Sequence, residues 1–292
     1  MHVFSGIWIP LVTPFRQGRV DHEALRRLVR HYRAARVSGL VACGSTGEAS
    51  AMEADEQTAA LDTVLDAAAG LPVAMGLAGS HCGQLQRRIA ALGRRPLAAL
   101  LVPAPYYVRP SQEGLLRHFL TLADASPWPL IVYDIPYRTG AVIETVTLER
   151  LGAHPGIRAV KDCGGSLDKT VALIGRGFDV LAGEDLHVLS TLCLGGSGAI
   201  AASAHLRPDL FVALHEAVAR QHLAHARALF QALAPVIRLL FAQPNPGPLK
   251  ALLARQGLIG PELREPFLPA DPALARRLFA AADELDRAFP AG

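Results

Sequence analysis

The chain has 292 residues, about half of them apolar, which is enough to bury a large core in one domain or in a domain with an appendage. Its formal charge of +3 is small and its basic residues are scattered, so we expect no nucleic-acid partner, and its four widely spaced cysteines predict reduced thiols rather than disulfides or a zinc site. The N-terminus lacks the features of a signal peptide, and no apolar run approaches the ~18 residues of a membrane helix, so we expect a soluble, cytoplasmic protein with no membrane partner.

Eight short apolar runs bounded by turn residues predict strands. They cover residues 6–15, 39–46, 71–78, 98–107, 129–136, 157–163, 178–184 and 198–204. Each run is apolar on both faces, as strands of a parallel sheet are when both sides of the sheet are covered. Helical patterns lie between the runs, and the clearest, over residues 21–35, has Leu25, Leu28 and Tyr32 on one stripe and Asp21 at its N-cap.

Strands that alternate with helices predict βα units, and eight such units predict closure into an α/β fold of the (β/α)8 TIM barrel class. A doubly wound open sheet is the alternative, but its usual Gly-rich fingerprint does not follow the first predicted strand. After residue 205 the strand pattern stops, and helical spacing continues to residue 289 with a break at 243–248. We therefore predict a barrel over residues 1–221 and a C-terminal helical extension over residues 222–292.

The active site of such a barrel lies at the C-terminal ends of its strands. Six of the predicted strands end in GSTGE, PYYVRP, YDIPYRTG, KDCGG, GED and AASAH. A lysine, several tyrosines, an arginine and a Ser–Thr pair are therefore expected to meet at one mouth. No set of Asp, Glu and His with metal-ligand spacing occurs there, so we expect chemistry without a metal.

Lys161 is one of three lysines in a chain that otherwise uses arginine, and it follows an apolar strand. A lysine that points into the barrel is desolvated, which lowers its pKa. The neutral amine is the nucleophile that forms Schiff bases with carbonyl compounds. The alternative is a rim lysine paired with Asp162 or another acid, and position alone leaves both interpretations open.

The other polar groups at this mouth each allow two interpretations. Tyr133 suits a general acid–base or a carboxylate ligand, but it could equally cap the core. Arg138 suits bidentate binding of a carboxylate, or it is an ordinary surface arginine. The Gly-bounded GSTGE turn offers hydroxyls and free N–H groups as a carboxylate cradle. The glycines of LGGSGA, residues 194–199, could instead cradle a phosphate.

Taken together, these motifs resemble the dihydrodipicolinate synthase / N-acetylneuraminate lyase family of class I, Schiff-base aldolases. The resemblance runs from PLVTPF to QPNPGPLK, and GSTGE, YDxP, the lysine after the sixth strand and GxIAxS occur in the family's order. PYYVRPSQEG at 105–114 and RTG at 138–140 are similar to the synthase branch, which condenses pyruvate with aspartate semialdehyde on the route to lysine.

The resemblance implies four catalytic residues. Lys161 would form the Schiff base with pyruvate, and Tyr133 would be the general acid–base over the imine. Ser45 and Tyr107 would complete a proton relay, with Tyr107 reaching in from a neighbouring subunit. The implied assembly is a homotetramer built from dimers.

It also implies four substrate-binding residues. Thr46 would hold the pyruvate carboxylate, Arg138 would bind the carboxylate of the second substrate, and Gly183 and Ile200 would supply backbone contacts near the imine. The implied substrates are pyruvate and a small aldehyde. No cofactor and no metal are needed, because the lysine itself is the electron sink.

Several positions depart from the usual synthase pattern: Ser45, Val108, Asp134, Tyr137 and the CGG that begins at Cys163. They leave the second substrate open, so a pyruvate-releasing lyase or a dehydratase of another 2-keto acid is an alternative, as is a non-catalytic ligand-binding protein. The positions that match the lysine-effector site of feedback-inhibited synthases hold Ala54, Gln57, Ser80 and Gln84. We therefore predict weak or absent inhibition by lysine.

Overall fold

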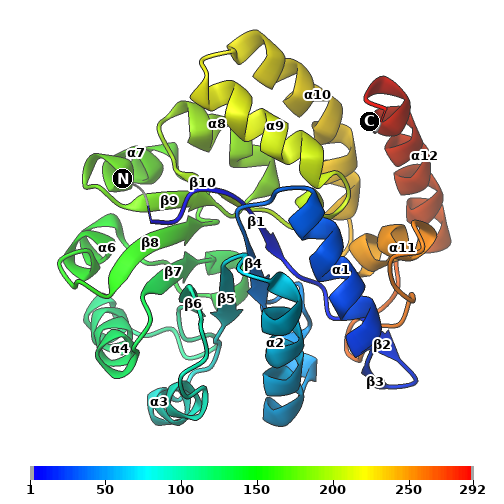
Figure 1. Ribbon diagram of the computed structural model, residues 1–292. Helices are drawn as coiled ribbons and strands as arrows, with labels where there is room; N and C mark the ends of the chain where they lie inside the picture. The colour runs from blue at the N-terminus through cyan, green and yellow to red at the C-terminus, as the bar shows by residue number, and fades with distance from the viewer. Residues whose placement is uncertain (1–2, 291–292) are drawn as a thin grey trace.

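A closed barrel of eight parallel strands forms the centre of the molecule, whose computed structural model describes residues 3–290 (Figure 1). Around the barrel the strands follow the order β1-β10-β9-β8-β7-β6-β5-β4. Their bounds are β1 Gly6–Pro10, β4 Gly39–Ala42, β5 Val73–Gly76, β6 Ala99–Pro103, β7 Leu130–Asp134, β8 Ile157–Asp162, β9 Asp179–Ala182 and β10 Gly198–Ile200. Each predicted run contains one of these strands, so the TIM barrel prediction is confirmed and the open-sheet alternative is wrong.

Helices surround this barrel, and α1 shows why they form where they do. The side chains of Leu25, Leu28 and Tyr32 are buried against the barrel, and the Asp21 carboxylate accepts a hydrogen bond of 2.9 Å from the N–H of Ala24, as the sequence predicts. The bounds are α1 His22–Ala34, α2 Ala54–Ala68, α3 Cys82–Ala91, α4 Gln112–Ala125, α5 Pro136–Thr139, α6 Thr145–Leu151, α7 Leu167–Gly175, α8 Val188–Cys193 and α9 Pro208–Ala219, with short 3-10 turns η1 Ala49–Ala51, η2 Asp185–His187 and η3 Ser203–His205.

Two local elements differ from the predicted pattern. The first run was expected to extend to residue 15, but β1 ends at Pro10 and the chain continues into an antiparallel hairpin of β2 (Phe15–Arg16) and β3 (Arg19–Val20). Pro14 has no N–H group with which to extend a ladder, and Gly18, with a φ of 74°, forms the turn. The helical turn α5, which carries Arg138, is the other element that the strand-and-helix pattern did not predict.

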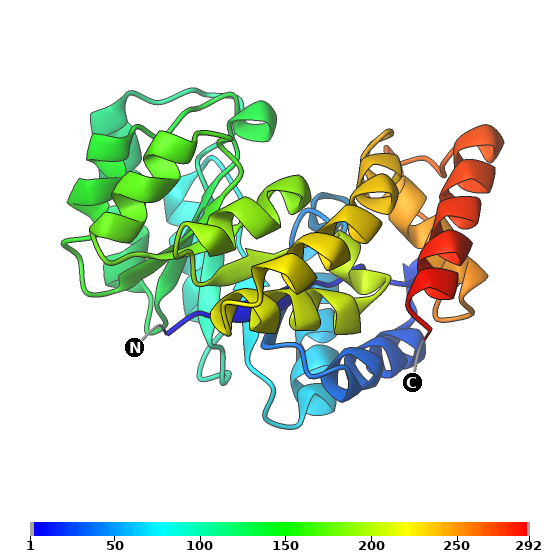
Figure 2. The ribbon, with the colours of Figure 1, turned by 90° about the horizontal axis from the view of Figure 1, so that it is seen from above.

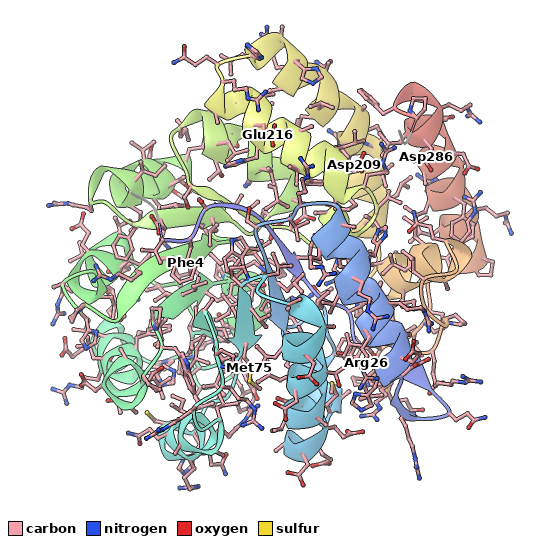
Figure 3. The ribbon with its side chains drawn as sticks, in the orientation of Figure 1. Phe4, Arg26, Met75, Asp209, Glu216 and Asp286 are labelled. Atoms are coloured by element: carbon pink, nitrogen blue, oxygen red, sulfur yellow. The ribbon has the colours of Figure 1, made fainter. Side chains whose placement is uncertain are left out.

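The barrel interior is filled by side chains from alternate positions of the strands, so it is a packed core and not a channel. Phe4 packs against Trp8 at a ring-centroid distance of 5.9 Å, and the Asp179 carboxylate accepts hydrogen bonds from the N–H groups of Val3 and Phe4, both at 2.8 Å. Figure 3 shows Phe4 and Met75 among the side chains of the core, and Arg26 and Glu216 on the outer helices. The end of the barrel at which the strands begin is therefore closed.

Three helices follow the barrel: α10 (Leu223–Leu240), α11 (Gly247–Arg255) and α12 (Pro272–Ala288). They lie on the side of the molecule near α1 and away from α4 and α6 (Figure 2). Arg207 ties the extension to the barrel, because it contacts Asp209 at 2.7 Å and Asp286 of α12 at 2.9 Å, two residues labelled in Figure 3. The predicted boundary at residues 221 and 222 falls between α9 and α10, and the division into two parts stays a prediction.

Helix α10 is long and apolar enough, by length and composition alone, to cross a membrane. It packs against α9 and α12, and its buried side chains, among them Leu229, Leu233 and Ile237, face these neighbours. This is the placement of a core helix.

Candidate active site

Lys161 and Tyr133 lie side by side near the C-terminal ends of neighbouring strands. They are register partners in the β7–β8 ladder, and the Lys161 Nζ atom lies 4.3 Å from the centroid of the Tyr133 ring. The residues are only 6% and 7% exposed, respectively. The parallel register therefore places an amine against an aromatic face inside the barrel, which is the arrangement that the sequence predicted for a Schiff-base lysine and its tyrosine.

The environment of Lys161 favours the neutral amine. Burial is the main cause that lowers the pKa of Lys161, while Cys163, Asp185 and Glu184 act in the opposite direction. A lowered pKa increases the fraction of neutral amine near neutral pH, and this form attacks carbonyl carbons. Burial also raises the pKa of the Tyr133 hydroxyl well above its usual range, so this group stays a protonated hydrogen-bond donor.

The alternative interpretation of Lys161 as a rim cation paired with Asp162 is wrong. Asp162 accepts hydrogen bonds from the Gly164 N–H at 2.8 Å and from the Thr170 hydroxyl at 2.7 Å. Within residues 3–290, Lys161 forms no ion pair with an acid. The side chain of Asp162, the next residue in β8, thus points to the opposite face of the strand, toward α7.

Gly183, just beyond β9, gives Lys161 the space it needs. A Cβ atom at this position would lie 2.3 Å from the Cys163 sulfur and 2.9 Å from Cγ of Lys161, distances at which real atoms do not pack. The Gly183 N–H donates to the Asp162 carbonyl at 2.8 Å, which holds the loop in place. A glycine is required here because the lysine side chain runs directly over its Cα.

The cavity around Lys161 contains seven of the eight predicted site residues. Its wall includes Ser45, Thr46, Tyr133, Arg138, Lys161, Gly183 and Ile200. Tyr107 is the exception, because its side chain is 92% exposed and its N–H donates to the Thr139 carbonyl at 3.2 Å on the outer loop. Its predicted role from a neighbouring subunit stays a prediction.

The GSTGE turn after β4 carries Ser45 and Thr46, and residues far away in the sequence hold it. The Thr46 hydroxyl accepts a hydrogen bond of 2.9 Å from the side-chain amide of Asn245. Glu48 has a left-handed backbone with a φ of 54° and is fully buried, where it forms an ion pair with Lys250 of α11. The C-terminal extension therefore forms part of the site, which the sequence pattern did not predict.

A second anchor comes from the segment between α11 and α12. The N–H of Arg264 donates to the Glu48 carboxylate at 2.9 Å, and the Arg264 guanidinium binds Glu56 at 2.7 Å. From the barrel side, the Thr13 hydroxyl donates to the Gly47 carbonyl at 2.7 Å. The turn is thus fixed from both sides.

Asp185 is a cavity residue to which the sequence pattern gave no role. It is buried, and the N–H group of Ser203 donates to its carboxylate at 2.6 Å, as does the Ser203 hydroxyl. Burial, as the largest cause, raises the pKa of Asp185 to about 6. The motif GED contained the signal, but the sequence alone did not show which of its two acids faces inward.

Asp134, which departs from the family pattern, has a buried partner. Its carboxylate pairs with Lys169 of α7, whose amine also donates to the Ile143 carbonyl. The carbonyl of Asp134 accepts from the N–H of Cys163 at 2.8 Å. This ion pair lies behind the strand ends that carry Tyr133 and Lys161, so the acid at position 134 faces away from the cavity.

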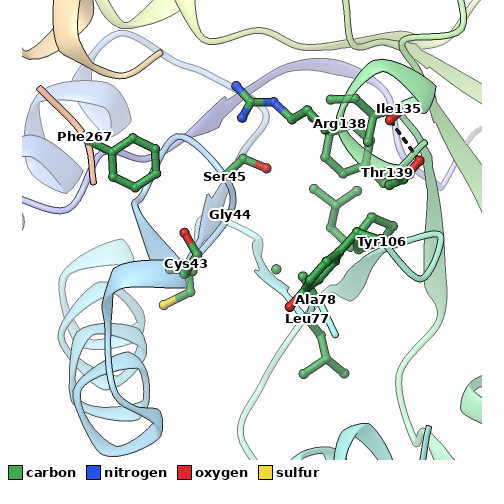
Figure 4. A pocket seen from close by; sticks show the side chains of 16 residues that line it. Cys43, Gly44, Ser45, Leu77, Ala78, Tyr106, Ile135, Arg138, Thr139 and Phe267 are labelled. Carbon is green, nitrogen blue, oxygen red and sulfur yellow. Dashed lines mark hydrogen bonds between the residues drawn. The ribbon is translucent and has the colours of Figure 1, made fainter. Parts of the chain in front are cut away.

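A wider cavity of about 300 Å³ adjoins the Lys161 cavity, and Ser45, Tyr133 and Arg138 line both. Figure 4 shows Arg138 extending from α5 toward the loop that carries Ser45, with Phe267 on the opposite wall. The rest of the lining is mainly apolar, including Leu77, Leu101, Pro103 and Ile135. A second molecule held here would lie next to both the tyrosine and the arginine.

The glycines of LGGSGA lie at the start of β10, at the barrel end opposite Lys161. A Cβ atom at Gly196 would lie 2.8 Å from the Thr191 carbonyl oxygen, and the Ser197 hydroxyl donates to the Val180 carbonyl at 3.2 Å. These glycines form a tight turn between α8 and β10. The interpretation of this segment as a phosphate cradle at the active mouth is therefore wrong.

A model of the dihydrodipicolinate synthetase family matches residues 3–284. The chain belongs to this family. It is 35% identical over 279 residues to 4-hydroxy-tetrahydrodipicolinate synthase 2 of Clostridium acetobutylicum, a match that covers 94% of this chain and 98% of the relative. It is 38% identical to the corresponding enzyme of Sphingopyxis alaskensis, over 93% of this chain and 95% of that one.

Solved structures of the family agree. Dihydrodipicolinate synthase from Acinetobacter baumannii, solved in complex with pyruvate, superposes with a TM-score of 0.93 at 29% identity, covering 96% of this chain and 98% of that one. The chain is therefore an enzyme of the class I aldolase type, and the predicted resemblance is confirmed. The alternative of a non-catalytic binding protein has no support in these findings.

Proposed function

We propose that the enzyme condenses pyruvate with L-aspartate 4-semialdehyde to 4-hydroxy-tetrahydrodipicolinate through a Schiff base on Lys161. The observation that carries this proposal is the buried Lys161 amine 4.3 Å from the centroid of the Tyr133 ring, in a cavity that also contains Thr46 and Arg138. The names of the relatives support the choice of substrates, as does the Arg138 guanidinium at the border of the two cavities.

The first half of the proposed reaction takes place in the Lys161 cavity. The neutral amine attacks the keto carbon of pyruvate, and the resulting carbinolamine loses water to give a protonated imine, with Tyr133 relaying the protons. Thr46 holds the pyruvate carboxylate, while Gly183 and Ile200 border the imine through their backbone. Loss of a proton from the pyruvate methyl group then gives an enamine.

The second half joins the two substrates. The enamine carbon attacks the aldehyde carbon of the semialdehyde, whose carboxylate Arg138 holds as a bidentate partner. The new alkoxide takes a proton from the relay of Tyr133, Ser45 and Tyr107 of a neighbouring subunit. The amino group of the product then attacks the imine carbon, closes the ring and releases Lys161 as the free amine. This relay requires a neighbouring subunit. We propose that the assembly is a homotetramer built from dimers, which sedimentation would test, and that the enzyme is cytoplasmic.

Trapping with borohydride tests the chemistry. Borohydride reduces a pyruvate imine to a stable secondary amine, so the proposal expects pyruvate-dependent labelling of the peptide that contains Lys161. Turnover with aspartate semialdehyde then tests the second substrate. A protein that pyruvate leaves unlabelled would disprove the Schiff-base step.

A second candidate function is an aldolase or dehydratase of another 2-keto acid on the same lysine. The apolar wall of the wider cavity favours it, because Leu77, Leu101, Ile135 and Phe267 offer contacts to a longer or less polar carbonyl compound. A panel of aldehydes and 2-keto acids, compared by kcat/KM, separates the two candidates. Higher kcat/KM for aspartate semialdehyde than for every other aldehyde supports the synthase.

A further inference from the structure

The loop between α10 and α11 closes one side of the Lys161 cavity and places Asn245 in its wall. Asn245 is only 8% exposed, and its side-chain amide donates a 2.9 Å hydrogen bond to the Thr46 hydroxyl. The two residues are 199 positions apart in the chain. This contact joins the extension to the residue expected to bind a carboxylate.

The direction of this hydrogen bond determines what the Thr46 hydroxyl can do. A hydroxyl carries one proton and can accept through two lone pairs, whereas an Asn NH2 group can only donate. Because Asn245 donates to Thr46, the proton of the Thr46 hydroxyl is not used in this contact. Among the described residues the Thr46 side chain forms no other hydrogen bond, so its proton is free to point into the cavity.

The loop that carries Asn245 is itself fixed by a buried charge pair. Lys250 lies one turn into α11, pairs with Glu48 of the same GSTGE turn, and donates to the Glu262 carbonyl at 2.9 Å. Asn245 and Lys250 thus bind Thr46 and Glu48, two residues of one turn, from one segment of the extension. This arrangement holds the amide of Asn245 at a constant position relative to Thr46.

We propose that Asn245 is a positioning residue that directs the Thr46 proton toward the carboxylate of the bound 2-keto acid. The inference rests on the proposed function, in which Thr46 holds this carboxylate. A hydrogen bond to a charged acceptor is stronger than one between neutral groups, so the orientation of this one proton affects substrate affinity. Asn245 acts on binding through the Thr46 hydroxyl.

The test replaces Asn245 by Asp and by Ala. An Asp side chain can only accept, so Thr46 must turn its proton toward residue 245, and a negative charge is added near the substrate carboxylate. We expect the pyruvate concentration for half-maximal borohydride labelling of Lys161 to rise roughly 10- to 100-fold in Asn245→Asp and roughly 3- to 10-fold in Asn245→Ala. At saturating pyruvate, the final extent of labelling in both variants should equal that of the wild-type enzyme.

Thr46 variants show whether Asn245 acts through the hydroxyl. Thr46→Val removes the hydroxyl, so adding Asn245→Ala to it should raise the half-maximal concentration by less than about 2-fold. Thr46→Ser keeps the hydroxyl and should restore the sensitivity to Asn245→Ala. This series keeps the inference testable even where Asn245→Asp fails to fold, and thermal unfolding of each variant identifies such a failure.

Gln256→Glu is the matched control, because it makes the same amide-to-acid change at an exposed position of the same extension. It should leave the labelling curve unchanged. Equal effects of Asp and Ala at position 245, or additive effects of Asn245→Ala and Thr46→Val, would overturn the inference while wild-type labelling stands. Absence of labelling in the wild type would instead overturn the proposed function, so the two failures are distinguishable.

Discussion

Two regions of the cavity reach their geometry by different means. Lys161 and Tyr133 are placed by the register of β7 and β8, a ladder of backbone hydrogen bonds between strands that are neighbours in the chain. Thr46 and its turn are placed by side chains of the extension, about 200 residues away, through Asn245, Lys250 and Arg264. The first region depends on the barrel alone, whereas the second needs the whole chain to be folded. Substitutions in the first should therefore change chemistry, and those in the second should change binding and stability.

The largest effect is expected at Lys161, in the first region, which the register of β7 and β8 places. Lys161→Arg keeps a cation but removes the amine that forms an imine, so turnover should fall to the background rate and borohydride labelling should disappear. Mass spectrometry of the labelled peptides is the measurement, and Lys169 and Lys250, the other lysines in the chain, are internal controls. Label on either of these two in the wild type would show that the wrong lysine has been assigned.

Removing the Tyr133 hydroxyl should have the next largest effect. We expect Tyr133→Phe to lower kcat by about 10²- to 10⁴-fold, the usual contribution of a general acid–base, while labelling of Lys161 continues at a slower rate. Steady-state kinetics measure kcat, and labelling reactions quenched at a series of times measure the rate of Lys161 labelling. Tyr32→Phe is the matched control, because the Tyr32 hydroxyl is buried and lacks a hydrogen-bond partner in the described chain. Equal kcat values for the two Phe variants would remove Tyr133 from the mechanism.

Substitutions in the second region, the turn held by the C-terminal extension, should change mainly the stability of the protein. Lys250→Met leaves Glu48 as an unpaired buried charge, so we expect a loss of about 3–5 kcal/mol in the free energy of unfolding. Urea unfolding is the measurement, and the double variant with Glu48→Gln should recover part of the loss. Asp283→Asn, which breaks an exposed ion pair with Arg255 in the same extension, should cost at most about 1 kcal/mol. Similar losses in both single variants would mean that the buried pair does not hold the turn.

Asp185 should give a smaller, pH-dependent effect. Its pKa in the folded protein is about 6, above the ordinary value of 3.8, because burial disfavours the charged form. The stability that this shift contributes is fully present below about pH 3.8 and is lost as the pH rises through about 6. Asp185→Asn removes this titration. As the pH rises from about 3.8 to about 6, the free energy of unfolding of the variant should therefore increase by about 2–3 kcal/mol relative to that of the wild type, and the difference should persist at pH 7.

Urea unfolding at a series of pH values measures the Asp185 effect. The groups that interact with Asp185 include Lys161, Glu184, Ser203 and Cys163. Because the Asp185 charge raises the pKa of Lys161, the Asn variant should also form the pyruvate imine at somewhat lower pH. A stability difference that is constant from pH 4 to pH 8 would contradict the assignment of a raised pKa.

The comparison of the two regions also explains how far the sequence could predict the site. Strand ends in a parallel barrel all open to one face, so a lysine and a tyrosine that end neighbouring strands could be predicted to meet. The contact of Asn245 with Thr46 could not be predicted, because no sequence periodicity relates residues in segments that lie far apart in the chain. The pairing of Glu48 with Lys250 was hidden for the same reason.

Other features needed side-chain directions that the sequence does not give. Of the two acids in GED, Asp185 lines the Lys161 cavity and Glu184 does not. Which of them does so depends on how the chain leaves β9. Asp134 departs from the family pattern, but its partner Lys169 lies on the following helix, and only the packing of α7 brings the two together. The Asp185 charge bears on the chemistry because it raises the pKa of Lys161, and composition alone cannot locate such a charge.

The smallest expected effect concerns free lysine, which we predict to inhibit turnover weakly or not at all. The positions where feedback-inhibited relatives bind lysine hold side chains that are engaged within the chain: the Gln57 amide donates to the Ala49 carbonyl at 2.8 Å, and the Ser80 hydroxyl donates to the Tyr106 carbonyl at 2.7 Å. Gln57 also accepts from Arg88, whose guanidinium repels an incoming ammonium group. Initial rates with increasing L-lysine are the measurement, with D-lysine as the control for ionic strength. Loss of activity at sub-millimolar L-lysine would show that the region around Gln57 and Ser80 reorganises around an effector, which its own hydrogen bonds oppose.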